Sequence, residues 1–567
     1  MMPPSRRVLV LCTAIALVGM ACQQNSETAG RQPKAGTKPG GNLIVGITEP
    51  ASIEPTSANA FESSGNLVIR TICDSLIQFD PVDGKARSAI AESWIISDEG
   101  ERMTVKIRKD ILFHNGEEVT AEDIVFSLSR VASKDYGSPV ATQLEPILGY
   151  ELVHGDASLE AQEDVDERLL TEMQGLRVLD DYSFEIRLKE KRADFLRILG
   201  HPLASPLPKQ AVDRGSKDFA KEPDCTGPYR LSEPWEPGMP SIKVERFEDY
   251  YARNEALTSG GKGYPDTIEF RIFPDREAAL NAFLGGNVDI APVPQSMLEQ
   301  ARGPNLVSGV TGSLEYIGLP AAQEPFSRRS VRIAFSQALD RQAISNSVFA
   351  GLKTPATSFL PPTLGNYHRK DACGNNTPIA GDINAARESL VESNVDLAGK
   401  ALKFYFNDEF DNRRMVEAVA SQWSAAFGIQ FELQPMGWDP FLEKGVRSPG
   451  FDGPFRLGWA PQYQSADGYL QPLFHSGSIG QNNLGWFANE EFDNALERRA
   501  RRAETDADLE VEYKNLEDIA CAEMPIVPVA FGGKAHAVRK EKLDSAVSDV
   551  FADVTTGDVL LRELFVK

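Results

Sequence analysis

The sequence predicts an α/β fold, because segments with the patterns of strands and of helices both occur along the chain. Asn42–Ile47 is an apolar run after its first residue and has the length of a buried strand. Met103, Val105 and Ile107 alternate with polar residues, which is typical of a strand with one buried face. The N-terminal part of the chain is therefore expected to contribute strands.

A strand–helix–strand unit lies in the second half of the chain. Leu402–Phe406 has the pattern of a strand, Val416–Phe427 has one apolar helical face, and Ile429–Leu433 has the pattern of the next strand. Gly428 follows the helix directly, where a left-handed glycine commonly ends a helix. Two strands joined by a helix suit parallel pairing, which favours an α/β sheet.

A capped helix is expected to begin after Thr120. Phe113-His114-Asn115-Gly116 has the composition of a turn, in which we expect His114 to be structural. Thr120 and Asp123 then form a variant of the capping box. Apolar residues follow at helical spacing and give the helix one buried face: Ile124, Val125, Leu128 and Val131.

Length and charge bound the class of protein. A chain of 567 residues is long enough for two to four domains, or for one large multi-lobed unit. The formal net charge of -23 argues against binding to nucleic-acid phosphates and against adsorption to anionic lipid headgroups. An acidic surface that serves only solubility is also compatible with this charge.

The N-terminus has the pattern of an export signal. Two Arg at positions 6 and 7 precede the apolar stretch Val8–Val18, which is too short to span a bilayer. Gly19-Met20-Ala21-Cys22 resembles the lipobox of bacterial lipoproteins, although a Leu is usual where Gly19 stands. We expect a signal peptide over residues 1–21, lipidation of Cys22, and a polar, flexible tether over residues 22–41. An ordinary secretory signal with a chance Cys is the alternative.

Four cysteines remain in the body of the chain. They are Cys73, Cys225, Cys373 and Cys521, an even number in an exported protein, which suits two disulfides with three connectivities to choose from. We favour Cys73–Cys521 with Cys225–Cys373, and four buried thiols are the alternative. No C-x-x-C pair is present, so we expect no metal site.

A series of short motifs along the body resembles one known family. The segment Ile90–Arg130 contains a Trp, the turn at 113–116 and Thr-Ala-Glu-Asp-Ile-Val-Phe-Ser at 120–127. Further motifs follow in order at Thr226–Tyr229, Phe283–Ile290, Ala338–Arg341 and Met524–Pro528. Together they resemble solute-binding protein family 5, the dipeptide-, oligopeptide- and nickel-binding lipoproteins of ABC importers. Within this family, the segment Gly453–Leu473 most resembles the oligopeptide-binding type.

This resemblance implies a two-lobed, periplasmic-binding-protein-like α/β fold of type II, class C, with an extra inserted domain. Domain I would consist of residues 42–78, 204–312 and 526–567. Domain II would be the insert 79–203, and domain III would cover residues 313–525.

The resemblance also implies a ligand loop. Arg456-Leu457-Gly458-Trp459-Ala460-Pro461-Gln462-Tyr463 is similar to the Arg-x-Gly-Trp-x-x-Asp-Tyr loop of peptide binders, in which the Asp grips the ammonium of a peptide. Here Gln462 replaces that Asp, and a Gln carbonyl accepts a hydrogen bond without neutralising a charge. Three explanations stay open: another acid such as Asp467 or Glu315 meets the ammonium, the peptide has a blocked or differently placed N-terminus, or the ligand is not a peptide.

Further ligand contacts are expected around this loop. Trp459 and Trp438 would be flat cleft walls, with a core Trp as the alternative. Arg456 would hold the carboxylate end of a peptide, with a structural ion pair as the alternative. Tyr463 belongs to the loop, and the strand Ser313–Ile317, which contains Glu315 and Tyr316, would pair with the peptide backbone unless it is an ordinary sheet strand.

The sequence contains no signature of an enzyme. H-E-x-x-H, G-x-S-x-G and Walker motifs are absent, the six His are scattered, and we expect neither catalytic residues nor a cofactor. We expect a monomeric, lipid-anchored, extracytoplasmic solute-binding protein that captures oligopeptides for an ABC permease and its ATPase and binds no nucleic acid. The alternatives are a nickel chelate, haem or sugar as ligand, or a role as a peptide-sensing surface receptor.

Overall fold

The computed structural model describes residues 40–56, 63–79, 86–97, 100–138, 140–155, 171–192, 194–213, 219–252, 264–408, 412–461, 465–503, 505–543 and 557–566. The predicted signal peptide, Cys22 and most of the predicted tether lie outside the described residues. Gln462 and Tyr463 of the predicted ligand loop lie outside them as well.

The largest sheet of the described chain has eleven strands in the order β15-β14-β16-β12-β17-β11-β1-β10-β9-β8, and β13 pairs with β17. β1, the first of these strands along the chain, is parallel to β10 and to β11. It confirms the buried strand predicted at Asn42–Ile47. The strands are β1 Asn42–Thr48, β8 Tyr229–Leu231, β9 Ser241–Arg246, β10 Thr267–Phe273, β11 Ile290–Pro292, β12 Leu306–Gly318, β13 Thr354–Pro355, β14 Ala401–Asn407, β15 Gln430–Met436, β16 Phe455–Trp459 and β17 Ile526–Val538.

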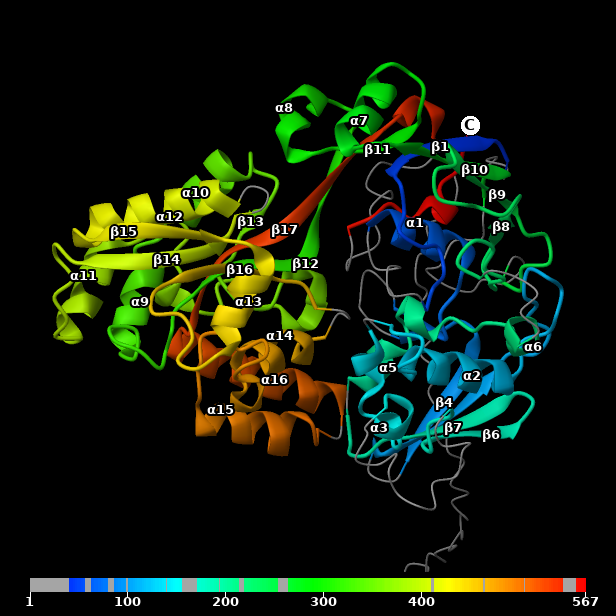
Figure 1. Ribbon diagram of the computed structural model, residues 1–567, viewed down its shortest axis with the longest axis horizontal. Coiled ribbons are helices and arrows are strands. Elements are labelled where there is room, and N and C mark those ends of the chain that lie inside the picture. The colour runs from blue at the N-terminus through cyan, green and yellow to red at the C-terminus, as the bar shows by residue number, and fades with distance from the viewer. Residues whose placement is uncertain are drawn as a thin grey trace, which may run out of the picture. The chain divides into compact units, whose positions relative to one another are not determined.

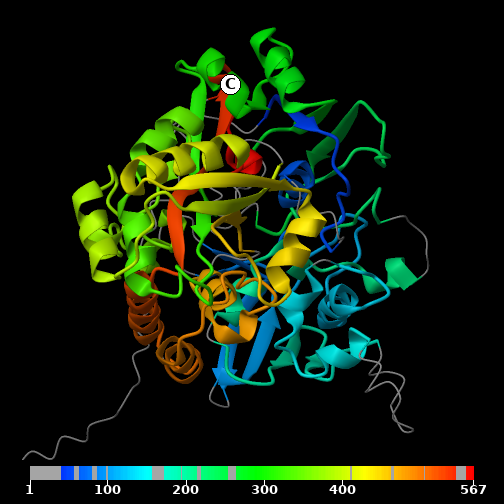
Figure 2. The same cartoon turned by 60° about the vertical axis from the view of Figure 1, so that its left-hand side comes forward.

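The predicted strand–helix–strand unit is confirmed. β14 and β15 are parallel over their whole length, and the helix α12, Asn412–Phe427, connects them. Gly428 ends this helix with a φ of 69°, a left-handed conformation that costs least for glycine. Figures 1 and 2 show α12 lying along β14 and β15.

Two long strands, β12 and β17, run side by side through the large sheet (Figure 1). Leu306–Val310 pairs with Gly533–Ala537, and Leu314–Gly318 pairs with Ile526–Phe531. The register shifts between these two ladders, opposite Gly532, where an added Cβ would lie 1.9 Å from Ser313 Oγ. A second, smaller register shift lies between Glu315 and Tyr316, so the pair connects two parts of the sheet through an irregular stretch.

A second sheet of four antiparallel strands has the order β4-β5-β7-β6. Its strands are β4 Ala91–Ser97, β5 Arg102–Ile107, β6 Leu176–Asp180 and β7 Ser183–Arg187, while β2 Ile77–Phe79 and β3 Ala86–Ser88 form a separate hairpin. In β5, Met103, Val105 and Ile107 are buried, which confirms the predicted alternation.

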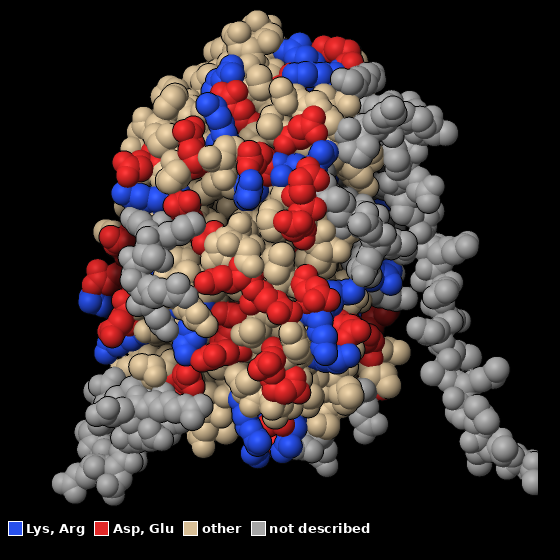
Figure 3. Space-filling view, turned by 90° about the vertical axis from the view of Figure 1, so that its right-hand side faces the viewer, with Lys and Arg blue, Asp and Glu red and all other residues tan. Residues whose placement is uncertain are grey.

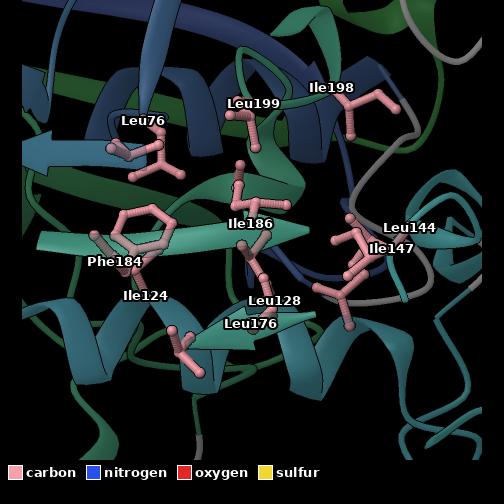
Figure 4. Packing of buried hydrophobic residues seen from close by; sticks show 14 of the residues in the cluster. Leu76, Ile124, Leu128, Leu144, Ile147, Leu176, Phe184, Ile186, Ile198 and Leu199 are labelled. Atoms are coloured by element: carbon pink, nitrogen blue, oxygen red, sulfur yellow. The ribbon is translucent and has the colours of Figure 1, made fainter. Parts of the chain in front are cut away.

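The predicted capped helix is α2, Ala121–Ala132, which covers this sheet. The backbone N–H and the hydroxyl of Thr120 both donate to Asp123 Oδ2, at 2.9 and 2.7 Å. Ile124 and Leu128 of α2 pack with Phe184 and Ile186 of β7 (Figure 4). These residues belong to one core cluster that extends from Leu76 to Ala204.

The other helices surround the two sheets. They are α1 Ser63–Ile72, α3 Tyr150–Val153, α5 Phe195–Ile198, α6 Lys209–Asp213, α7 Arg276–Leu284, α8 Leu298–Ala301, α9 Arg329–Gln337, α10 Arg341–Val348, α11 Ile383–Glu392, α13 Trp438–Val446, α14 Asp467–Phe474, α15 Glu490–Ala495 and α16 Asp506–Glu523. Short helical turns are η2 Ala141–Leu144, η4 Pro202–Ala204, η5 Gln295–Met297, η6 Pro362–Tyr367, η7 Gly374–Asn376, η8 Ser476–Ser478, η9 Leu496–Ala500, η10 Lys540–Lys542 and η12 Leu561–Glu563.

The two disulfides differ from the favoured pairing. The bonds are Cys73–Cys225 and Cys373–Cys521, with Cα–Cα distances of 4.9 and 4.8 Å. The prediction of Cys73–Cys521 with Cys225–Cys373 is therefore wrong. The physical reason is that Cys73 and Cys225 lie in one core cluster while Cys373 and Cys521 lie in another, so the favoured bonds would have joined two separate cores.

His114 has the structural role that the sequence predicts. Its Nδ1 accepts the backbone N–H of Cys225 at 3.3 Å, and its Nε2 lies 3.1 Å from the carbonyl oxygen of Gly227. The turn at Phe113–Gly116 is thereby fastened to the Thr226–Tyr229 motif beside the first disulfide.

Candidate ligand-binding site

Two of the residues predicted to contact ligand, Trp459 and Arg456, lie on opposite faces of the large sheet. β16 is paired antiparallel to β12, with Trp459 opposite Leu314 and Arg456 opposite Ile317. Because side chains alternate along a strand, Trp459 and Arg456, three residues apart, point to opposite faces. Trp459 packs against the core cluster that contains Tyr316, whereas Arg456 lies beside Glu315.

The two predicted wall tryptophans differ in their surroundings. The indole Nε1 of Trp459 donates to the carbonyl oxygen of Gly468 at 2.8 Å, and one part of the side chain stays exposed. Trp438 is 42% exposed and stacks on Phe441 with a centroid distance of 6.2 Å. Neither Trp is a fully buried core residue, so both keep a surface that a ligand can contact.

Glu315 is enclosed by two cations. Its carboxylate accepts from Lys353 Nζ at 2.5 Å and from Arg456 Nη2, and the residue is 8% exposed. Burial by itself raises the pKa of Glu315, but the charges and hydrogen bonds of Lys353 and Arg456 outweigh it and lower the pKa below its usual value. Arg456 therefore makes the structural ion pair that was the alternative, and Glu315 has no unpaired charge for a ligand ammonium.

The strand Ser313–Ile317 does not offer a free edge. Leu314–Ile317 is paired with β16 on one side and with β17 on the other. The prediction that this segment binds a peptide backbone is therefore wrong, because its backbone groups already take part in two ladders. Tyr316 is 1% exposed and belongs to the core. Because its side chain is buried, its predicted contact with ligand is wrong as well.

A cavity of about 380 Å³ lies on the Arg456 side of the sheet. It is lined by Gln295, Glu315, Phe349, Lys353, Asn407, Asn412, Met415 and Arg456. Asn407 ends β14 and Asn412 begins α12, so the cavity lies at the carboxyl end of a parallel strand, where α/β sheets usually bind ligands. The two cations and one carboxylate leave its wall with one net positive charge.

Asp467 lies next to Trp459 and joins a buried cluster of charges. Arg192 lies 3.2 Å from carboxylate oxygens of both Asp467 and Asp194, and the hydroxyl of Ser465 donates to Asp194 at 3.1 Å. Burial, and then the charge of Asp194, raise the pKa of Asp467. Asp467 therefore shares its counter-ion with a second acid.

Sequence reasoning named Asp467 but missed Asp194 and Arg192. The charged run Glu190–Asp194 follows β7 and carries no motif, and 275 residues separate Arg192 from Asp467. No sequence signal links the two segments.

A larger cavity, of about 1240 Å³, lies between residues of the four-stranded sheet region and the segment around α15 and α16. One wall is built by residues in and between β4 and β5, by the segment that follows β7 and by Leu196 of α5, and the other by residues 497–509. The lining residues are Ile96, Ser97, Gly100, Glu101, Met103, Leu188, Glu190, Lys191, Arg192, Leu196, Glu497, Arg498, Arg501, Arg502, Ala503, Thr505, Asp506 and Leu509. Arg192 connects this cavity with Asp467 and, through Gly468, with Trp459.

Other kinds of site are absent from the described residues. No group of three or more His, Cys, Asp or Glu side chains is arranged to hold a metal ion there. In the same residues, no helix combines the length and the apolar character needed to cross a membrane.

The fold and these two cavities suit a protein that binds a solute. The family model "Bacterial extracellular solute-binding proteins, family 5 Middle" matches residues 85–481, and the chain belongs to this family. Its fold is accordingly the two-lobed, periplasmic-binding-protein-like α/β fold with an extra inserted domain. The chain is a solute-binding protein of the ABC transporter class, not an enzyme, and it acts outside the cytoplasm.

Three similar proteins illustrate the family. The dipeptide-binding protein DppE of Bacillus subtilis (strain 168) is 24% identical over 93% of both chains. The glutathione-binding protein GsiB of Salmonella choleraesuis (strain SC-B67) is 25% identical over 84% of this chain and 86% of its own. The unliganded open form of the periplasmic murein tripeptide binding protein MppA is 20% identical, with a TM-score of 0.78 over 94% of this chain and 99% of its own.

Proposed function

We propose that this protein captures short peptides and delivers them to the permease of an ABC importer. The observation that carries the proposal is the cavity of about 1240 Å³ that Arg192 links, through Asp467, to the neighbourhood of Trp459. Pockets for drug-sized molecules measure roughly 300–1,000 Å³, so this cavity suits a ligand as large as a short peptide. The relatives named above bind a dipeptide, glutathione or a murein tripeptide, which supports the same ligand class.

Trp459 and Trp438 serve in this proposal as apolar walls for varied side chains. Gln462 and Tyr463 contact the ligand from the same loop, and Arg456 faces the smaller cavity with its charge matched by Glu315. No cofactor takes part, and ATP is consumed by other subunits.

The proposed domains follow the predicted boundaries. Domain I comprises residues 42–78, 204–312 and 526–567, domain II residues 79–203, and domain III residues 313–525. The core cluster from Leu76 to Ala204 supports a separate insert, and the register shift between Val310 and Leu314 supports a boundary near residue 312. The lobes close over ligand by bending there, and small-angle scattering should show compaction when saturating ligand is added.

The protein is proposed to be a monomeric lipoprotein. Cys22 carries the lipid, and replacing it (Cys22→Ser) should release the protein from membranes into the soluble fraction. Retention of this variant on membranes would contradict lipid anchoring.

On the face drawn in Figure 3, Asp and Glu side chains lie among Lys and Arg, and the chain as a whole has a net charge of -23. This charge supports the proposal that nucleic acid is not a partner.

Native mass spectrometry of the purified protein, followed by sequencing of whatever is released on denaturation, tests the ligand class. Release of a set of short peptides would support the proposal. Release of a single non-peptide molecule, such as a nickel chelate, haem or a sugar, would overturn the peptide assignment and keep the fold. Capture of peptides without delivery to a permease would instead favour a peptide-sensing receptor.

A further inference from the structure

We propose that Arg501 is the anchor for a carboxylate group of the ligand inside the large cavity. The inference rests on the proposed peptide function and adds to it the chemical group that the cavity recognises. This group is a carboxylate, from either the C-terminus or an acidic side chain of the peptide.

The charges that lie deepest in the cavity wall are positive. The side chains of Arg192 and Arg501 are 13% and 18% exposed. Three acids of the same wall, Glu190, Glu497 and Asp506, are exposed, at 65% for Glu190 and 51% for Glu497, and the fourth, Glu101, is half-buried. Solvent screens the exposed acids more strongly than the enclosed guanidinium groups. Arg192 is matched by Asp194 and Asp467, so Arg501 is the enclosed cation that a ligand inside the cavity can meet.

The two enclosed arginines differ in how well they are paired. Arg192 has Asp194 and Asp467 within 3.2 Å. Among the described residues, Arg501 has one ion-pair partner, Glu190, with 3.6 Å between Nη1 and Oε1, which is beyond hydrogen-bond length. The charge of Arg501 also acts to lower the pKa of Asp467, against the rise that burial causes. Its Nε is buried and has no hydrogen-bond partner among the described residues. A buried donor without an acceptor is costly, and an incoming carboxylate would remove that cost.

The local backbone at Arg501 is unusual as well. Leu496–Ala500 is a π-helical turn between α15 and α16, and the backbone N–H of Arg501 donates to the carbonyl oxygen of Leu496 at 3.0 Å. Such turns are rare inside helices and are frequent at functional sites. The turn places Arg501 in the cavity wall, whereas the neighbouring Arg499 pairs with Glu512 and is not among the lining residues.

The chemistry of the wall fits one ligand class. A guanidinium group binds a carboxylate through two parallel hydrogen bonds. Lys191, Arg498 and Arg502 line the same cavity and add positive charge, while Met103 and Leu509 offer apolar surface for peptide side chains. Arg456, the residue that the sequence had suggested for this role, is already matched by Glu315.

The test compares wild type with Arg501→Gln and with Arg499→Gln, which removes the same charge two residues away and outside the cavity. The probe is a library of random tri- to pentapeptides, supplied in a free-acid and in a C-terminally amidated form, and native mass spectrometry of the full-length protein measures capture. We expect wild type and Arg499→Gln to prefer the free-acid library by about 10- to 100-fold. Arg501→Gln should lose this preference. Arg501→Lys should keep part of it, because Lys keeps the positive charge but lacks the planar guanidinium group that makes two parallel hydrogen bonds.

Each outcome has a distinct meaning. Enrichment of Asp- or Glu-containing members within the amidated library would identify side-chain carboxylates as the source, and no enrichment would identify the C-terminus. Equal capture of both libraries without such enrichment, or an unchanged preference in a folded Arg501→Gln variant, would overturn the anchor and leave the peptide function standing. If wild type captured neither library, the peptide function would fail, and the anchor with it.

Discussion

Glu315→Gln should be strongly destabilising, because it leaves two cations without their shared counter-ion. The Glu315 side chain is 10% exposed and contacts both Lys353 and Arg456, whose side chains are 20% and 13% exposed. A Gln carbonyl still accepts one hydrogen bond but cannot neutralise either charge. Removing one partner of a buried ion pair costs about 3–5 kcal/mol, and we expect the free energy of unfolding to fall by this amount at pH 7.

The pH dependence of this loss follows from the pKa of Glu315, which Lys353 and Arg456 hold below its usual value of 4.5 despite burial. A carboxyl with a lowered pKa in the folded state stabilises the protein above its unfolded pKa. It loses this contribution as the pH falls through the folded pKa. The difference between wild type and Glu315→Gln should therefore be complete at pH 7 and should shrink only below pH 4.5.

Urea denaturation followed by tryptophan fluorescence measures both effects. The matched control is Asp408→Asn, which breaks an ion pair with Arg413 of similar length, 2.7 Å, whose side chains are 43% and 45% exposed. Exposed pairs contribute about 0.2–1 kcal/mol, so the control should change little. A loss for Glu315→Gln no larger than that of Asp408→Asn would refute the reasoning about burial.

Three further predictions concern other parts of the fold. Gly532→Val should lower the free energy of unfolding by about 1–3 kcal/mol, because its Cβ would overlap Ser313 Oγ at 1.9 Å and Thr311 Oγ1 at 2.4 Å. Thermal unfolding measures this loss. In the same assay the control Gly437→Ala, whose nearest neighbour is 3.7 Å away, should be tolerated. Burial raises the pKa of Glu517 from 4.5 to about 6, so between pH 4.5 and pH 7 wild type should lose about 2 kcal/mol of stability that Glu517→Gln does not lose; parallel pH profiles would contradict this. Replacing Cys373 and Cys521 together by Ala should cost about 2–5 kcal/mol, since the bond closes a loop of 148 residues, and an unchanged urea midpoint would show that the bond constrains nothing.

The local elements and the family were legible in the sequence. The capping residues Thr120 and Asp123, the terminating Gly428 and the alternation in β5 are set by neighbours in the chain, and each is found in the structure. The family motifs are equally local, and the match over residues 85–481 shows the family that they indicated. The pattern in residues 455–459 could also have shown that Arg456 and Trp459 lie on opposite faces, since strand side chains alternate.

The tertiary structure alone decided the pairings between distant segments. The disulfide partners, the two-sided pairing of Leu314–Ile317 and the contact of Arg192 with Asp467 join residues that are roughly 140 to 275 positions apart. The same holds for the cavity that encloses Arg501, whose walls come from two regions separated by about 300 residues. Sequence patterns report which face of an element is apolar and where it ends, because these properties depend on near neighbours. Which buried faces meet depends on the packing of the whole chain, and for this reason the sequence by itself determined the elements and the family, while only the fold decided the partners of the site.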